Sequence, residues 1–448
     1  MEKKIRPKER DAVLQSIKAG VVPRVGLHHI QVGRVNEIGA IISDIERIVD
    51  SGSSIRLVIG DYGAGKTFFL HLIRTIAQEK GLVTAYADLN PDRRLHATGG
   101  QARNLFSELM RNVSTRTKPD GGALGSIVEK FISSTLAEAK EKGFSVNTLI
   151  FEKLAKLTEM VNGYDFADVI SSYWNGHDTG NEQLKMDAIR WLRGEFSTKT
   201  DARNSLGVRT IVDDGNVYDH LKLLAKFVNI AGYNGLLICY DEMVNLYKLS
   251  NTQARTSNYE QILRILNDTL QGISAGLGFI MCGTPDFLMD SRRGLYSYQA
   301  LQSRLAENSF AKAAGVMDYS GPVIRLANLS PEDIFVLLQN IRNVFASYNE
   351  EKFLIDNEGL KAFLQHCSKR IGDSYFRTPR TTIKSFADLL SILEQNTSLQ
   401  WQNLINEIPI EADKSDEIEI PDEEIVENNN EVENLDKRDD DELSSFKL

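Results

Sequence analysis

The chain has 448 residues, 42% of them hydrophobic, which is enough for a large buried core and an accessory domain. Its three cysteines (Cys239, Cys282 and Cys367) lack metal-ligand spacing, and two lie in apolar runs typical of buried strands. This pattern argues against a disulfide scaffold and favours a cytoplasmic protein. No stretch reaches the length of a membrane span, and the basic start MEKKIRPKER leads into no unbroken apolar segment, so we expect no signal peptide.

The formal net charge of −10 is unevenly distributed along the chain. Residues 411–448 carry 16 acidic and 4 basic side chains, which leaves 46 acidic and 48 basic side chains on the first 410 residues. The body is therefore close to neutral, which is compatible with nucleic-acid contact but does not argue for it. The sequence after Pro409 is acidic, rich in Asn and poor in aromatic residues, and predicts a disordered tail over residues 409–448.

The N-terminal third alternates between helical and strand patterns. Apolar residues at helical spacing occupy 36–50 (NEIGAIISDIERIVD), and the short apolar run 55–59 (IRLVI) has the length of a buried strand. After a glycine-rich loop, the sequence FFLHLIRTIAQEK predicts a helix that ends at Gly81. A second strand is predicted over 82–88, before the turn signal Asn90-Pro91.

The middle of the chain is mainly helical in pattern over residues 101–230, with breaks near 118–125 and 175–182. This block is longer than a crossover connection needs, so we interpret it as a helical insertion. Strand character then returns in three apolar runs. Continuous apolar runs alternating with helices predict a parallel sheet covered on both faces. The three runs are 235–241 (GLLICYD), 276–283 (GLGFIMCG) and 322–326 (PVIRL).

The C-terminal region opens with a helix-start signal, in which Ser330 is the cap and Pro331 occupies the first helical position. Helices are expected from there to about Ile408. The predicted architecture is an α/β core with a parallel five-stranded sheet over residues 1–329, a helical lid over 330–408 and the acidic tail over 409–448.

The segment GDYGAGKT satisfies the full P-loop pattern in the required context, after a strand and before a helix. Glycines let the backbone curl so that its N–H groups point at phosphate oxygens, and the following helix offers its positive end. Lys66 is expected to reach the β- and γ-phosphates of ATP, and the Thr67 hydroxyl to bind Mg²⁺. The alternative, a glycine-rich turn with a chance lysine, fits this context poorly. The expected nucleotide-binding residues are Gly60, Asp61, Tyr62, Gly63, Ala64, Gly65, Lys66, Thr67 and Phe68.

The acid pair Asp241-Glu242 follows the strand LLICY and supplies the metal side of the same centre. Asp241 is expected to hold Mg²⁺ through water. Glu242 is expected to polarise an attacking water, which favours hydrolysis over transfer to a bound acceptor. The alternative is a pair of helix-capping acids at a strand end. The P-loop and the acid pair together indicate an ATPase more strongly than either motif alone.

Three further residues are candidates for catalytic roles. Thr284 follows the next strand, where a polar side chain can position water or sense the γ-phosphate, although a plain strand-to-turn transition fits the local sequence equally well. Arg304 is a candidate arginine finger acting on a neighbouring subunit, and Arg380 is a candidate lid sensor. For each arginine the alternative is a surface residue without a catalytic role. The pair His28-His29 shows no companion ligands in the sequence, so we expect no metal site there.

In this order, the motifs resemble the AAA+ branch of P-loop ATPases, in particular the origin-recognition and transposition ATPases. The segments VVPRVGLHHIQVGRVNEI, GDYGAGKTFFLHLI and YADLNPDRRLHATGG further resemble the ATP-binding protein of BREX-type bacterial phage-defence systems (the BrxD family). That resemblance runs from about Arg10 to about Leu393. It implies that Gly33 and Arg34 lie near the adenine and ribose, and that a helicase is a partner. Unlike in origin-recognition proteins, no winged-helix domain is evident after the lid, which leaves DNA binding by this chain open.

The sequence therefore predicts a Mg²⁺-dependent, oligomeric AAA+ ATPase of anti-phage defence, acting with DNA or with a DNA-acting partner. One alternative is a small-molecule or nucleotide kinase, which Glu242, the insertion and the lid disfavour. A second is a scaffold that binds ATP and hydrolyses it poorly. A GTPase is disfavoured because the guanine-reading motif Asn-Lys-x-Asp does not occur.

Overall fold

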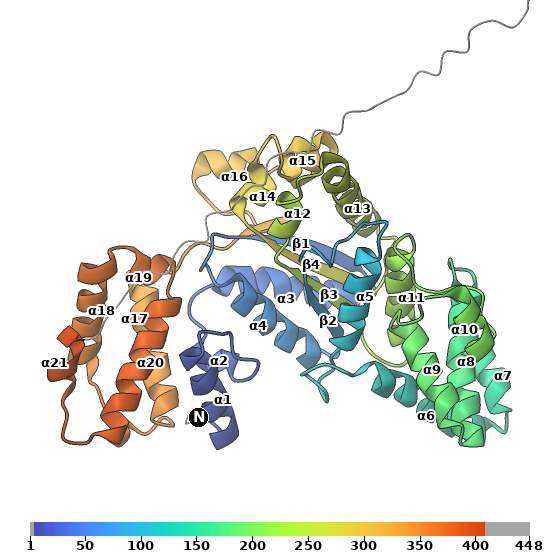
Figure 1. Ribbon diagram of the computed structural model, residues 1–448, viewed down its shortest axis with the longest axis horizontal. Helices are drawn as coiled ribbons and strands as arrows, with labels where there is room; N and C mark the ends of the chain where they lie inside the picture. The colour runs from blue at the N-terminus through green and yellow to red at the C-terminus, as the bar shows by residue number, and fades with distance from the viewer. Residues whose placement is uncertain (1–3, 408–448) are drawn as a thin grey trace, which may run out of the picture.

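The computed structural model describes residues 4–407, with a central α/β unit flanked by helices on both sides (Figure 1). Its five strands form one sheet in the order β2-β3-β4-β1-β5, and all neighbouring strands are parallel. The predicted parallel five-stranded sheet is therefore confirmed, and each strand overlaps one of the five apolar runs. The acidic tail predicted over 409–448 lies outside the described residues. The strands are β1 (Ser53–Ile59), β2 (Val83–Asp88), β3 (Leu236–Asp241), β4 (Leu277–Gly283) and β5 (Val323–Arg325).

Helices cover both faces of this sheet, which explains why its strands are continuous apolar runs. Every residue of β1, β3 and β4 is buried. On one face, α3 (Val35–Val49) and α4 (Lys66–Glu79) pack Ile41, Ile45 and Phe69 against Val58 of β1 and its neighbours. On the other face, Leu57 shares a core with α5 (Gln101–Arg111), α11 (Val217–Ile230) and α13 (Thr252–Leu270).

Seven helices, α5 to α11, lie within residues 101–230 (cyan to green in Figure 1). Helices α5 and α11 pack on the sheet, and α6 to α10 extend away from it. Their buried side chains, Phe131, Phe166 and Trp191 among them, continue the core beneath the sheet without interruption. The expected break near 175–182 coincides with the junction of α8 and α9. The helices not yet defined are α6 (Leu124–Lys142), α7 (Val146–Thr158), α8 (Gly163–Thr179), α9 (Glu182–Leu192) and α10 (Lys199–Leu206).

Helix α11 carries His220, which is only 2% exposed and packs against the rings of Phe106 and Trp191. Burial lowers the pKa of His220 from 6.5 to about 4. As the pH falls, His220 is therefore protonated in the unfolded chain before it is protonated in the folded protein. The free energy of unfolding consequently decreases between pH 6.5 and 4. We expect His220→Leu to remove up to about 3 kcal/mol of that acid-dependent loss. The measurement is urea unfolding across this pH range, with exposed His177→Leu as the control, which should keep the wild-type slope.

The chain after β5 is helical, and its first helix, α17 (Pro331–Phe345), begins as the sequence predicts. The Ser330 hydroxyl accepts from the Asp333 N–H at 3.1 Å, and the Asp333 carboxylate accepts from the Ser330 N–H at 3.0 Å. This capping box fixes where α17 starts relative to β5. The later helices are α18 (Asn357–Ile371), α19 (Ser374–Arg377), α20 (Arg380–Gln395) and α21 (Trp401–Leu404).

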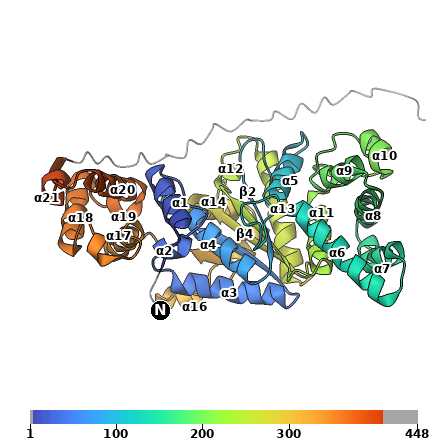
Figure 2. The same ribbon diagram turned by 90° about the horizontal axis from the view of Figure 1, so that it is seen from below.

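Two N-terminal helices, α1 (Pro7–Lys18) and α2 (Leu27–Ile30), were not foreseen from the sequence. Figures 1 and 2 show them between the C-terminal helices and α4. Their side chains Val13 and Ile30 share a core with Ile334 and Leu338 of α17. The beginning and the end of the described chain are therefore packed together beside the P-loop helix.

Short elements complete the fold between β3 and the C-terminal helices. None of the helices in the described part of the chain is long and apolar enough to cross a membrane. The remaining helices are α12 (Val244–Tyr247), α14 (Pro285–Met289), α15 (Gln299–Leu305) and α16 (Ser309–Ala314), with 3₁₀ turns at Leu295–Ser297, Glu350–Lys352 and Ile405–Glu407.

Candidate nucleotide site

The P-loop connects the carboxyl end of β1 to the first turn of α4. Gly63 and Gly65 both have φ of 79°, in the left-handed region that favours glycine, and Gly65 is the residue that caps α4. Buried Phe69 and Leu70 fix α4 against the sheet. The amino end of α4 therefore faces the interior of the loop, where its unpaired N–H groups and helix dipole favour an anion.

Lys66 is folded back onto its own loop. Its ammonium donates to the carbonyl oxygens of Gly60 at 2.7 Å and Asp61 at 2.8 Å. Burial lowers the pKa of Lys66, while the charge of Asp241 acts in the opposite direction. Phosphate oxygens are stronger partners for an ammonium than neutral carbonyls, so a bound phosphate would draw Lys66 away from these two bonds.

Asp241, at the carboxyl end of β3, contacts the P-loop through Thr67, although β4 lies between β3 and β1. The Thr67 hydroxyl donates to one carboxylate oxygen of Asp241 at 2.7 Å, and the other oxygen accepts from the Glu242 N–H at 2.9 Å. Burial raises the pKa of Asp241. A hydroxyl and a carboxylate side by side form the oxygen ligand set that Mg²⁺ prefers, so these residues fit that ion.

Glu242 adopts φ of 54°, a strained conformation for a residue with a side chain. The next residue, Met243, is anchored by its N–H donating to the Cys282 carbonyl at 3.0 Å. Burial and the neighbouring charge of Asp241 raise the pKa of Glu242. This position suits a carboxylate that must accept a proton, because a raised pKa strengthens a base.

Asp88 is a third carboxylate at this edge, and the sequence analysis did not single it out. It ends β2 in register with Asp241, lines the same cavity as Glu242, and its negative charge adds to the rise in the pKa of both acids. The available signal was an acid at the last position of a predicted parallel strand. Recognising its importance required knowing that β2 pairs with β3.

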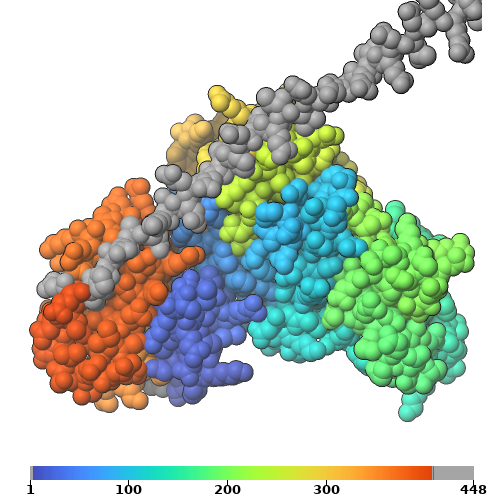
Figure 3. Space-filling model, viewed as in Figure 1, coloured from blue at the N-terminus to red at the C-terminus, as the bar shows by residue number. Residues whose placement is uncertain are grey.

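A cavity of about 900 Å³ opens beside the P-loop. Figure 3 shows the surface of α4 recessed between the dark-blue N-terminal segment and the cyan region that follows it. The volume lies at the upper end of the usual range for small-molecule sites. Part of its wall is apolar, which suits a nucleotide base, and comes from both ends of the chain. The apolar residues include Ile17, Val22, Ile30, Val32, Leu337, Ile341 and Ile383.

Of the two residues implied to bind adenine and ribose, Gly33 and Arg34, the second contacts the P-loop. The Arg34 guanidinium donates to the carbonyl oxygens of Ala64 and, at 3.2 Å, Ala327. Arg34 lines the cavity, whereas a side chain added at Gly33 would point at the carboxylate of Asp333. Arg34 therefore supports the shape of the loop directly, a contact that the sequence did not reveal.

Asp61 and Tyr62 lie at the start of the P-loop. The Asn328 amide donates to the Asp61 carboxylate at 3.1 Å, and the Tyr62 ring centroid lies 5.4 Å from the Lys66 ammonium. Tyr62, Gly63, Ala64, Gly65, Lys66, Thr67 and Phe68 all line the cavity.

Arg380 is brought to the cavity by the C-terminal helices. It is the first residue of α20, with Pro379 as the capping residue, and it lines the cavity wall. The segment before α20 touches the P-loop itself, since a Cβ at Gly63 would stand 2.9 Å from both the Arg377 carbonyl oxygen and the Thr378 Cα. The segment before α20 and the phosphate-binding loop are therefore in main-chain contact.

Arg304 and Thr284 lie in different surroundings. Arg304, on α15, donates to the Asn267 amide oxygen at 2.7 Å and to the Ala300 carbonyl at 2.8 Å, and is not among the described residues that line the cavity. Thr284 follows β4, between the strands that lead to Asp241 and to the P-loop. Thr284 is 2% exposed, and its hydroxyl accepts from the Phe287 N–H at 3.4 Å to cap α14.

The cap gives Thr284 a measurable structural contribution. We expect Thr284→Val to lower the free energy of unfolding by about 1 kcal/mol, whereas Thr284→Ser should keep most of the stability. Urea unfolding at neutral pH provides the measurement. A loss of ATP turnover in Thr284→Val beyond the small unfolded fraction would show that the hydroxyl also acts in hydrolysis. Unchanged stability would mean that the long hydrogen bond contributes nothing.

Comparison with known families assigns the chain. Residues 5–408 match the family model described as BREX system ATP-binding protein BrxC/D. The chain belongs to this family. No curated protein matches it. Membership in the BrxC/D family confirms the resemblance seen in the sequence, and it implies ATP binding and a role in phage defence alongside the other components of such a system.

Proposed function

We propose that this BrxC/D-family protein is a cytoplasmic, oligomeric AAA+ ATPase that hydrolyses ATP with Mg²⁺ and acts on DNA or with a DNA-acting partner such as a helicase. The proposal rests chiefly on the 2.7 Å hydrogen bond between Thr67 and Asp241, which joins the P-loop to the acid pair. The order of the strands supports the AAA+ assignment, because β4 places Thr284 between these two motifs.

Different residues of the site bind the phosphates, hold the metal ion and accept the proton. Lys66 and the amino end of α4 bind the phosphates, while Thr67 and Asp241 hold Mg²⁺, which when bound neutralises phosphate charge. Glu242 accepts a proton from the attacking water. Arg380, at the edge of the cavity, stabilises charge that develops on the γ-phosphate.

Product analysis of the wild-type protein tests this function. With Mg²⁺ and ATP, alone and with DNA or a helicase partner, we expect ADP and inorganic phosphate, and no turnover once Mg²⁺ is chelated. A kinase would instead place the phosphoryl group on a small acceptor. A nucleotide-dependent scaffold would bind ATP without releasing phosphate under any of these conditions, and either outcome would contradict hydrolysis.

Arg304 provides a test of the oligomer, because among the described residues it is not one that lines the nucleotide cavity of its own chain. We propose that it reaches the γ-phosphate held by a neighbouring subunit. Arg304→Ala and Lys66→Ala proteins should each be inactive, and mixing them should restore part of the turnover, since some interfaces then contain one intact Lys66 and one intact Arg304. Mixtures of either variant with itself are the controls. Without rescue in the mixture, a site shared between subunits would be wrong.

A further inference from the structure

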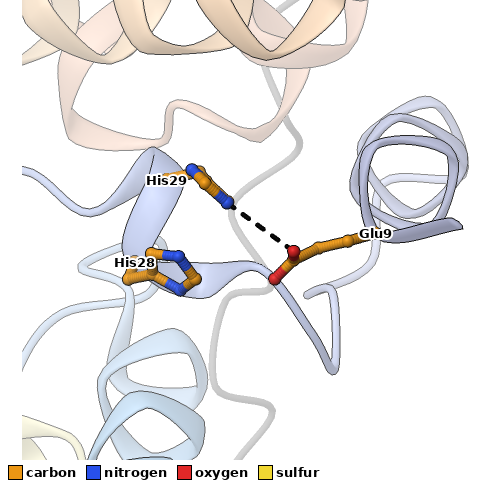
Figure 4. A group of neighbouring side chains, drawn as sticks. All are labelled: Glu9, His28 and His29. Carbon is orange, nitrogen blue, oxygen red and sulfur yellow. Dashed lines mark ion pairs between the residues drawn. The ribbon is translucent and has the colours of Figure 1, made fainter. Parts of the chain in front are cut away.

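The fold supplies the companion that the His28-His29 pair lacks in the sequence. Figure 4 shows Glu9 of α1 reaching toward the two histidines of α2. The Nε2 atom of His29 lies 3.8 Å from a carboxylate oxygen of Glu9, and the histidine ring centroids are 4.0 Å apart. One ligand atom from each of the three residues lies within 4.8 Å of the other two. A small movement would bring all three onto a single ion.

The position of His29 is fixed from a third element. Its Nδ1 is 2.8 Å from the hydroxyl of Tyr348, which lies just after α17. When Nδ1 carries the proton and donates it to Tyr348, Nε2 presents its lone pair on the side of Glu9. A hydrogen-bonded partner on the outer ring nitrogen is the usual support of a metal-binding histidine. His29 is 8% exposed, so this geometry is also protected by burial.

The absence of a side chain at Gly26 allows Glu9 to lie close to α2. Gly26 caps α2 with φ of 73°, and a Cβ there would stand 2.7 Å from Val13 and 3.0 Å from the Glu9 side chain. Any other residue at this position would have to displace the Val13 and Glu9 side chains and would adopt an unfavourable backbone conformation. The backbone is therefore shaped so that the start of α2 approaches Glu9 closely.

We propose that Glu9, His28 and His29 bind a divalent transition-metal ion, with Zn²⁺ as the best match. Two imidazole nitrogens and one carboxylate oxygen suit Zn²⁺, which accepts a water as its fourth ligand. Mg²⁺ and Ca²⁺ prefer oxygen ligands throughout, so this set selects against the ion of the nucleotide site.

The site would act on the wall of the nucleotide cavity. Ile17 in α1, the connection 20–24 and Ile30 in α2 all line that cavity, and Tyr348 belongs to the C-terminal region. An ion shared by α1 and α2 would clamp this wall and hold it against the C-terminal helices. This role is structural and separate from ATP hydrolysis.

Metal titration of the full chain tests the site. Protein freed of metal and nucleotide is titrated with ZnCl₂ by calorimetry, with excess Mg²⁺ to occupy the Asp241 site, and with Co²⁺ followed by visible absorption. Wild type should bind one Zn²⁺ per chain. Glu9→Gln, His28→Gln and His29→Gln should each bind at least about tenfold more weakly. The matched control is His177→Gln, an exposed histidine of α8, which should bind as wild type does.

A second measurement separates loss of the site from loss of the fold. Zn²⁺ should raise the unfolding midpoint of wild type and of His177→Gln, but not of Glu9→Gln, whose far-ultraviolet circular dichroism should remain that of wild type. Tyr348→Phe should weaken binding by about 10- to 100-fold if it orients His29. Failure of wild type to bind one Zn²⁺, or binding of Zn²⁺ by all three ligand variants as tightly as by wild type, would overturn the proposal.

Discussion

Glu242→Gln should reduce ATP turnover by about 100- to 10,000-fold while leaving ATP affinity nearly unchanged. Glutamine has the size of glutamate but cannot accept a proton from water. Because Glu242 follows the Mg²⁺ candidate Asp241 and contacts the cavity, the substitution removes the base and leaves the P-loop intact. The measurements are phosphate release at saturating ATP and Mg²⁺, and the ATP dissociation constant by calorimetry.

The control for this prediction is Glu260→Gln, an exposed glutamate on α13 that should keep wild-type turnover. Asp88→Asn identifies the competing base, because Asp88 lines the same cavity. If Glu242→Gln retained turnover and Asp88→Asn lost it, the base would be Asp88. If Glu242→Gln and Asp88→Asn both kept full turnover, neither carboxylate would be the base for hydrolysis.

Lys66→Ala should weaken ATP binding by about 100-fold, equivalent to about 3 kcal/mol, because charge-assisted hydrogen bonds to phosphate disappear. The same change should alter stability little. In the nucleotide-free protein Lys66 bonds only to the carbonyls of Gly60 and Asp61 among the contacts described, and water can replace it there. Calorimetric titration with ATP and urea unfolding provide the two readouts.

The matched control is Lys80→Ala, which removes an exposed lysine at the opposite end of α4. Lys80 pairs with Glu46 on the surface, an interaction worth little, so neither affinity nor stability should change noticeably. An ATP affinity of Lys66→Ala within threefold of wild type would contradict the assignment of the loop as the phosphate site.

Local sequence was sufficient for the sheet because its signals lie within short segments. Each strand is an apolar run of strand length, and the P-loop and the capping box at Ser330 are contiguous patterns. Helices α1 and α2 were missed for the opposite reason. Helix α2 has only four residues, and α1 buries its apolar side chains against α17, more than 300 residues away in the chain.

The parts of the site that sequence could not supply depend on contacts between distant segments. Arg34 bonds to the backbone carbonyl of Ala64, which carries no side-chain signature. Asp88 gains its importance from the pairing of β2 with β3, and Glu9 from the packing of α1 on α2. The P-loop motif alone was sufficient to place Lys66 and Thr67. The hydrogen bonds of Arg304 to Asn267 and Ala300, in contrast, depend on the folded structure.

The contact of Gly63 with Arg377 and Thr378 restricts which residue can stand at position 63. Because Gly63 has no side chain, the P-loop main chain itself packs against the segment that precedes α20. A Cβ at position 63 would stand 2.9 Å from both the Arg377 carbonyl oxygen and the Thr378 Cα, and main-chain atoms cannot turn aside as a flexible side chain can. Any residue other than glycine at position 63 would therefore have to displace the P-loop or the start of α20, so the fit between them depends on the missing side chain.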